Sequence, residues 1–179
     1  MVFTLEQDRM VRDFLDVYDI PGAAVAIVRG STIVAEGGFG LADVDQALPA
    51  TAHTVWPICS LTKSFTAVAA MQLVESQKLL LDTPVQTYLP GFRISDTAAS
   101  ERITSRLFLT HSSGLGRTGH QDRTREEQVN PYPTRKALVD ALDSATLQSA
   151  PGAAFSYCNE GFATVGHAIE TIAGLTLEQ

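Results

Sequence analysis

The segment Ser60-Leu-Thr-Lys63 follows a proline, Pro57, and opens an apolar stretch that ends near Val74. This pattern predicts an amphipathic helix from Cys59 to about Val74. Proline interrupts regular structure and often precedes a helix, and the apolar residues that follow recur at helical spacing. On a helix, residues three apart share a face, so the Lys63 amine can reach the Ser60 hydroxyl near the positive helix N-terminus. This layout is typical of a serine activated for acyl transfer.

A second motif, Tyr157-Cys-Asn159, follows the turn residues Pro151-Gly152 and precedes a predicted helix. A phenol beside an ammonium group can be held as phenolate and accept the serine proton, and an asparagine amide can orient a substrate carbonyl or amide. Two plainer interpretations stay open at this point. Ser60 can be a surface serine near a solvated lysine, and Tyr157 can be a half-buried aromatic residue whose hydroxyl is satisfied.

Composition limits the function further. The chain has 179 residues, 45% of them hydrophobic and 18% charged, which is typical of one globular domain that buries about 70% of its unfolded surface. The net charge of −7 argues against a nucleic-acid partner, because binding phosphates needs a basic face. No apolar run reaches the roughly 18 residues of a membrane span.

The N-terminal segment predicts no signal peptide, because residues 1–19 carry Glu6, Asp8, Asp13 and Asp16 among their apolar residues and no basic region followed by an apolar one. Two cysteines, Cys59 and Cys158, form no disulfide framework and fit a reducing compartment. We therefore expect a cytoplasmic protein. Export stays open, because earlier removal of a leader would leave the same chain.

The predicted elements give an α+β fold. A helix is expected at 5–17, capped by Thr4 with Gln7 three residues on. Two strands, 23–29 and 32–37, form a hairpin around Gly30-Ser31. Because an isolated hairpin is barely stable, it needs further strands or packed helices.

The rest of the chain is predicted to be mainly helical. The further helices are expected at 82–89, at 134–147 with Thr134 as cap, and at 160–173 before Gly174. Between them, 110–133 is rich in Gly, Ser, Thr and charge and is predicted to be a long loop of the kind that often borders active sites.

Five segments in a fixed order resemble the serine β-lactamase and penicillin-binding-protein superfamily. They are Trp56 to Ala67, Leu79-Leu-Leu-Asp-Thr-Pro84, Tyr88-Leu-Pro90, Leu109-Thr-His-Ser-Ser-Gly-Leu115 and Pro151 to Asn159. The closest resemblance is to the class C β-lactamase-like branch, which includes D-aminopeptidases, D,D-carboxypeptidases and family VIII esterases. It implies an antiparallel sheet flanked by helices plus a mainly helical subdomain.

The resemblance also implies roles for single residues. Ser60 would be the nucleophile, with its backbone N–H forming half of the oxyanion hole, Lys63 and Tyr157 would share proton transfer, and Asn159 would touch the substrate. The implied substrate is a small ester, β-lactam or D-amino-acid peptide, and no cofactor or metal is implied.

One element of the family pattern is missing. The third motif, Lys-Thr-Gly or His-x-Gly, has no match after Asn159, and Arg117-Thr-Gly119 imitates it only in a loop before Tyr157. We therefore expect one incomplete domain over 1–179, made of a helix and hairpin in 1–50 and a helical region in 51–179 that carries both motifs, with the C-terminal strands absent. The alternative function is a non-catalytic fragment or subunit that needs a C-terminal half, and its exposed edges predict a homo-oligomer or pairing with that half.

Other candidates carry less weight. His111 is a possible triad base or a loop histidine that satisfies backbone groups, and the histidines His53, His120 and His167 lack metal-ligand spacing. Cys59 and Cys158 are interpreted as small buried hydrophobic residues rather than a redox pair. The segment 122–127 is a charged loop that could lie at the cleft rim, and no Gly-x-Ser-x-Gly elbow supports an α/β-hydrolase.

Overall fold

The computed structural model describes residues 3–116 and 132–179, so Arg117-Thr-Gly119, His120 and the charged segment 122–127 lie outside the described residues. The chain divides into two compact units, Met1–Ile58 and Cys59–Gln179. The loop that follows residue 50 therefore groups with the N-terminal helix and sheet rather than with the helical region.

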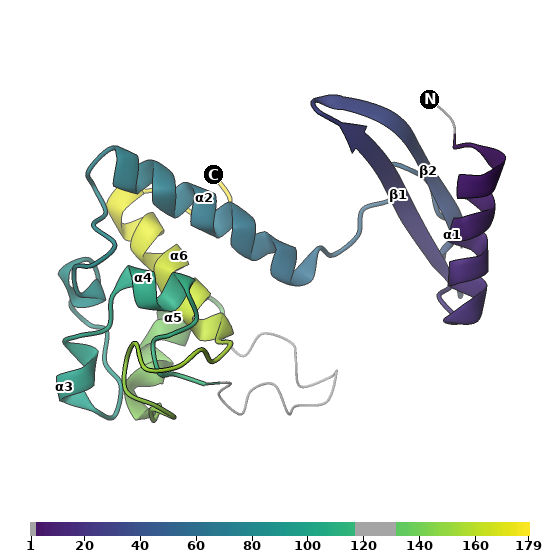
Figure 1. The fold of residues 1–179 in the computed structure, drawn as a ribbon. Helices are drawn as coiled ribbons and strands as arrows, with labels where there is room; N and C mark the ends of the chain where they lie inside the picture. The colour runs from purple at the N-terminus through teal and green to yellow at the C-terminus, as the bar shows by residue number, and fades with distance from the viewer. Residues whose placement is uncertain (1–2, 117–131) are drawn as a thin grey trace. The chain divides into compact units, whose positions relative to one another are not determined.

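The first unit packs one helix on a small antiparallel sheet (Figure 1). Helix α1 spans Leu5–Val17, and its predicted capping box is confirmed: Thr4 accepts a hydrogen bond from the backbone N–H of Gln7, whose side chain accepts one from Thr4 N–H. The helix covers the sheet through Leu15, which is buried, and through Arg12, whose guanidinium lies 5.3 Å from the ring centre of Phe39.

The sheet has the strand order β1-β2-β3, with β1 at Gly22–Arg29, β2 at Thr32–Asp43 and β3 at Leu48–Pro49. The hairpin prediction is confirmed, but β2 continues six residues beyond the predicted end at Gly37, and β3 was not predicted. Gly38 explains the difference, because a Cβ there would lie 2.2 Å from the carbonyl oxygen of Ala50. A glycine at this position therefore does not end the strand. It lets the backbone that follows the sheet approach β2 closely.

The second unit is helical and forms around α6, Asn159–Ala173, which contacts α2, α4 and α5 (Figure 1). The other elements of this unit within the described residues are η1 Cys59–Leu61, α2 Thr62–Glu75, η2 Val85–Thr87, α3 Thr97–Ser100, α4 Ser105–Leu109, α5 Arg135–Asp140 and η4 Ala141–Ser144. The α6 prediction is confirmed, and Gly174 ends this helix in the left-handed conformation, with φ of 70°.

Three helix predictions in this unit need correction. The helix expected from Cys59 begins as the 3-10 turn η1 and becomes α-helical only at Thr62, so Ser60 lies in the turn before α2. The helix expected at 82–89 is only the short turn η2. The helix expected at 134–147 has its predicted cap Thr134 but continues as α-helix only to Asp140, followed by η4.

The core of the second unit is a continuous apolar cluster. Phe92 and Phe108 meet edge to face in it, with ring centres 5.7 Å apart. Its other fully buried members include Leu79, Val85, Ile103, Leu115 and Val165. No helix among the described residues is long and apolar enough to cross a membrane.

Candidate active site

All four residues predicted for the site belong to the second unit, and the structure brings them together. Ser60 lies in η1, Lys63 in the first turn of α2, Tyr157 in the segment before α6, and Asn159 at the first position of α6. The contact of α2 with the start of α6 brings distant parts of the chain together, because Ser60 and Tyr157 are 97 residues apart in the sequence and their side chains meet.

The Ser60 hydroxyl has two polar partners. Its Oγ lies 2.5 Å from the Oη of Tyr157, and it accepts a hydrogen bond of 3.3 Å from the Nζ of Lys63. Both partner groups can exchange a proton with a serine hydroxyl. The geometry thus provides Ser60 with two possible proton acceptors at hydrogen-bond distance.

Lys63 is held between an amide and two aromatic rings. Its Nζ donates a hydrogen bond of 2.6 Å to the Oδ1 of Asn159. The same nitrogen lies 4.8 Å from the ring centre of Tyr157 and 5.6 Å from that of Phe162, at distances where a cation is attracted to the ring faces. Phe162 was not identified from the sequence, although its place three residues after Asn159 on α6 puts it on the same helix face.

The backbone in front of the serine is unusual. Cys59 has φ of 46°, in the left-handed region that residues other than glycine rarely occupy, and its side chain is exposed. The prediction of a buried Cys59 is therefore wrong. Cys158 is buried, as predicted, and burial raises the pKa of its thiol to about 12.

Two other serines, Ser112 and Ser113, directly follow His111 in the chain. Ser113 is buried, with 1% of its surface exposed, and Ser112 Oγ shares a hydrogen bond of 2.7 Å with Thr110 Oγ1. The side chain of Ser113 is thus closed off from solvent, and the Ser112 hydroxyl is engaged by Thr110.

His111 lies against the segment that carries Tyr157. Its Nδ1 accepts a hydrogen bond of 3.1 Å from the backbone N–H of Cys158, and its ring centre is 4.5 Å from that of Tyr157. Burial, assisted by the charge of Lys63, lowers the pKa of His111 below its ordinary value of 6.5. The histidine thus satisfies a backbone group, as one of the two sequence interpretations expected.

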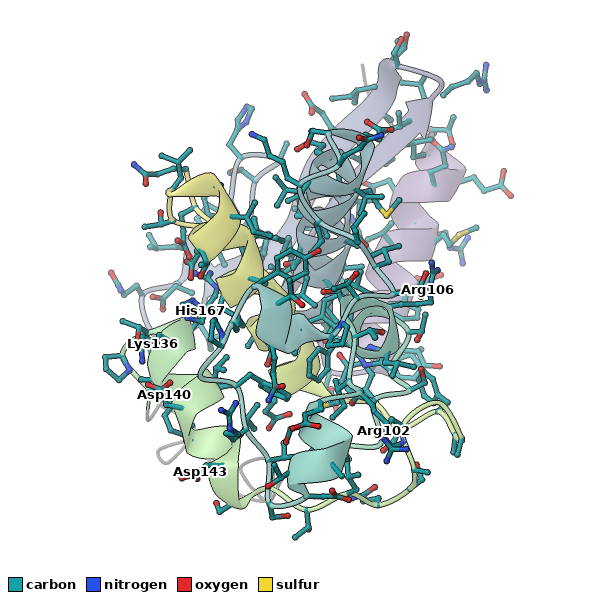
Figure 2. The ribbon with its side chains drawn as sticks, turned by 90° about the vertical axis from the view of Figure 1, so that its left-hand side faces the viewer. Arg102, Arg106, Lys136, Asp140, Asp143 and His167 are labelled. Carbon is teal, nitrogen blue, oxygen red and sulfur yellow. The ribbon has the colours of Figure 1, made fainter. Side chains whose placement is uncertain are left out.

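Elsewhere in this unit, Lys136, Asp140 and His167 line a cavity of about 300 Å³ beside α5 and α6 (Figure 2). Lys136 Nζ is bonded to Asp140 at 2.6 Å, so these charges neutralise one another. The described residues contain no group of three or more His, Cys, Asp or Glu side chains that could hold a metal ion.

The fold and the arrangement around Ser60 define a protein of the β-lactamase-like class. The family model described as Beta-lactamase matches residues 8–179, and the chain belongs to this family of serine hydrolases.

Similar proteins place the chain in the same superfamily. It is 29% identical over 166 residues to Protein flp of Staphylococcus aureus (strain NCTC 8325 / PS 47). The aligned region covers 92% of this chain and 32% of Protein flp. The octameric penicillin-binding protein homologue from Pyrococcus abyssi superposes with a TM-score of 0.80 at 30% identity, over 96% of this chain and 39% of that one. A class C beta lactamase superposes with a TM-score of 0.76 at 25% identity, over 96% of this chain and 44% of that one.

These findings confirm the predicted family and fold class. In each comparison the chain spans less than half of the relative's length, while most of this chain is covered.

Proposed function

We propose that this chain carries the acyl-enzyme site of a serine hydrolase that acts on an ester or amide carbonyl. The observation that carries the proposal is the position of Ser60 Oγ, 2.5 Å from the phenol of Tyr157 and 3.3 Å from the amine of Lys63. A serine between two proton acceptors can lose its proton as it attacks.

The reaction would proceed in two halves. Ser60 Oγ bonds to the carbonyl carbon while its proton passes to Tyr157 or Lys63, and the carbonyl oxygen becomes an oxyanion. As this intermediate collapses, the bond to the leaving group breaks and the leaving group takes up the proton. Water then attacks the acyl-serine ester, releases the acid and restores the Ser60 hydroxyl.

Two further groups would assist. By the family resemblance, the backbone N–H of Ser60 would stabilise the oxyanion. Asn159 Oδ1 is already bonded to Lys63 Nζ, so its amide N–H groups are the part available to a substrate carbonyl. The substrate would be a β-lactam, a D-amino-acid peptide or a short-chain ester, and no cofactor enters these steps.

A non-catalytic role is the second candidate. The chain spans 32–44% of the relatives compared, and the described residues after Asn159 contain neither Lys-Thr-Gly nor His-x-Gly. The loss of one oxyanion donor typically lowers the rate about 100- to 1000-fold. In this alternative the site becomes competent only when a C-terminal half is supplied by another chain.

The two candidates are separated by covalent labelling and turnover. The purified chain is treated with a fluorophosphonate or a fluorescent penicillin, and the modified residue is identified by mass spectrometry. Hydrolysis of a p-nitrophenyl ester is followed in parallel, with Ser60→Ala as control. A label on Ser60 that Ser60→Ala abolishes supports the hydrolase, whereas a label on Ser112 or Ser113 contradicts the assignment. Absence of both label and turnover favours the non-catalytic alternative.

A further inference from the structure

The segment that carries Tyr157 is bound on both sides by one residue. The carbonyl oxygen of His111 accepts a hydrogen bond of 2.7 Å from the N–H of Ser156, and its Nδ1 accepts one of 3.1 Å from the N–H of Cys158. Ser156 and Cys158 are the two neighbours of Tyr157 in the chain. His111 therefore fixes the backbone immediately before and immediately after the phenol.

The imidazole also contacts the tyrosine directly. The ring planes of His111 and Tyr157 are inclined by 31° with centres 4.5 Å apart, and the rings of Phe155 and Phe162 lie 5.6 Å and 5.1 Å from the imidazole. The imidazole thus packs against the tyrosine ring, while Phe155 and Phe162 pack against the imidazole.

The backbone of His111 contributes to this arrangement. It has φ of 55°, and it follows the short helix α4, where its N–H donates to Phe108 O at 3.1 Å. The left-handed turn reverses the chain after α4 and aims both acceptors of His111 at 156–158. Asparagine tolerates this conformation better than most residues do, which makes it the suitable conservative replacement.

The Cys158 hydrogen bond requires a neutral imidazole with an unprotonated Nδ1. Burial of the ring and the positive charge of Lys63 from α2 both oppose a second positive charge there. Protonation of Nδ1 would remove the acceptor and place a cation next to the site.

We propose that His111 is a positioning residue that holds Tyr157 against Ser60 by accepting hydrogen bonds from the backbone on both sides of it. The proposal rests on the acyl-transfer function proposed above. A displacement of about 1 Å in a reacting group can cost about 100-fold in rate, so loss of this hold should lower acylation of Ser60 by about 10- to 100-fold.

The test compares three variants with the wild-type chain. His111→Asn retains an oxygen in the place of Nδ1, His111→Phe retains a ring but no acceptor, and His53→Phe makes the same change at an exposed histidine of the first unit. Two readouts are taken: the rate of Ser60 labelling by a fluorophosphonate as a function of pH, and hydrogen exchange of the amides of 156–158 by mass spectrometry.

We expect His111→Phe to exchange faster at 156–158 and to be labelled about 10- to 100-fold more slowly, while His53→Phe matches the wild type. His111→Asn should stay within a few-fold of the wild type and lose the decline in labelling that protonation of His111 causes at low pH. This rescue and the changed pH profile would not follow from a purely structural role. If His111→Phe does not fold, the pH profile of His111→Asn decides.

Two results would overturn the proposal: unchanged exchange at 156–158 in His111→Phe, or labelling of His111→Asn as slow as that of His111→Phe. If the wild type itself is not labelled at Ser60, the acyl-transfer function fails. Exchange at 156–158 then still decides whether His111 holds the segment.

Discussion

Lys63 has the most demanding surroundings of the residues around Ser60. It donates to the serine and to Asn159, and two aromatic faces lie beside its ammonium group. These contacts hold the Lys63 nitrogen next to Ser60 and fit an electrostatic role, whereas acceptance of the Ser60 proton by Lys63 requires the neutral amine. The two roles can be separated by replacing the lysine with a cation that does not deprotonate.

We expect Lys63→Arg to lower the acylation rate of Ser60 by about 100-fold or more, because arginine keeps the charge but cannot act as a base at working pH. The rate of fluorophosphonate labelling measures this, with the exposed Lys78→Arg as the matched control. A Lys63→Arg variant that reacts at the wild-type rate would leave Lys63 only an electrostatic role and assign proton transfer to Tyr157.

His111 gives stability a defined pH dependence. Its pKa in the folded chain lies below the ordinary value of 6.5, because burial and Lys63 oppose its protonation. The unfolded chain therefore takes up this proton first as the pH falls. The contribution of His111 is fully present above 6.5 and is lost as the pH falls from 6.5 toward the lower pKa of the folded state.

Urea unfolding at a series of pH values between about 7.5 and 5 should thus show a steeper acid loss of stability for the wild type than for His111→Asn, which has no titrating group at this position. Hydrogen exchange of the second unit follows the same transition. Equal pH slopes for the two proteins would contradict the assignment.

Gly38 lies where β2 approaches the backbone that follows the sheet. Gly38→Ala places a methyl group 2.2 Å from the Ala50 carbonyl oxygen, and backbone atoms can move aside only by separating the strand from the following segment. We expect a loss of about 1–3 kcal/mol in the unfolding free energy of this unit.

The fluorescence of Trp56 can follow this unfolding in urea, since it is the single tryptophan of the chain and belongs to the first unit. Gly91→Ala is the matched control, because a Cβ at Gly91 meets no atom within 4 Å. If the two variants unfold at the same urea concentration, the close approach at Gly38 is not what limits the sheet.

The sequence predicted the elements whose signals are local. The capping box of α1, the hairpin and the end of α6 at Gly174 each depend on residues within a few positions of one another, and all are present. The extension of β2 and the strand β3 depend on the close approach of the backbone at Gly38 to that at Ala50. These residues are twelve positions apart, so local patterns did not predict the contact. The short helices α3 and α4 were missed because each is only about one turn long, and their caps, Asp96 and Thr104, resemble ordinary loop residues.

The candidate site shows the same division. Spacing predicted that Lys63 reaches Ser60, because both lie within one turn of chain. The meeting of Ser60 with Tyr157 and of Lys63 with Asn159 depends on tertiary packing of α2 on α6. The family resemblance implied the first through the shared role of Tyr157 and Lys63 in proton transfer, whereas the contact of Lys63 with Asn159 was not predicted. Nothing in the local sequence distinguished the hydrogen bond of His111 to Cys158 from the bonds that any loop histidine can make.

At the scale of the whole molecule, the apolar face of α2 is left uncovered by the other elements of the second unit. Leu61, Phe65 and Val68 lie along one side of it at helical spacing and are 68%, 69% and 60% exposed, with Met71 next to them at 44%. Contiguous exposed apolar surface of this kind promotes association.

We therefore expect the chain to associate in a concentration-dependent way and Phe65→Gln to shift it toward the monomer in sedimentation velocity. Phe14→Gln is the control, since Phe14 is also exposed, at 55%, but lies on α1. A wild-type chain that stays monomeric throughout the concentration range would show that the α2 face does not drive association.

The hydrogen bond between Ser60 and Tyr157 has a kinetic consequence. It closes a loop of 97 residues, and bringing such distant groups together costs about 4 kcal/mol of chain entropy beyond a constant term. That cost is met only when the packed core between α2 and α6 has formed, so contacts of such high sequence separation belong to the slow stage of folding. During refolding, the serine should therefore become reactive late, and the appearance of an acylatable Ser60 would time the completion of the second unit.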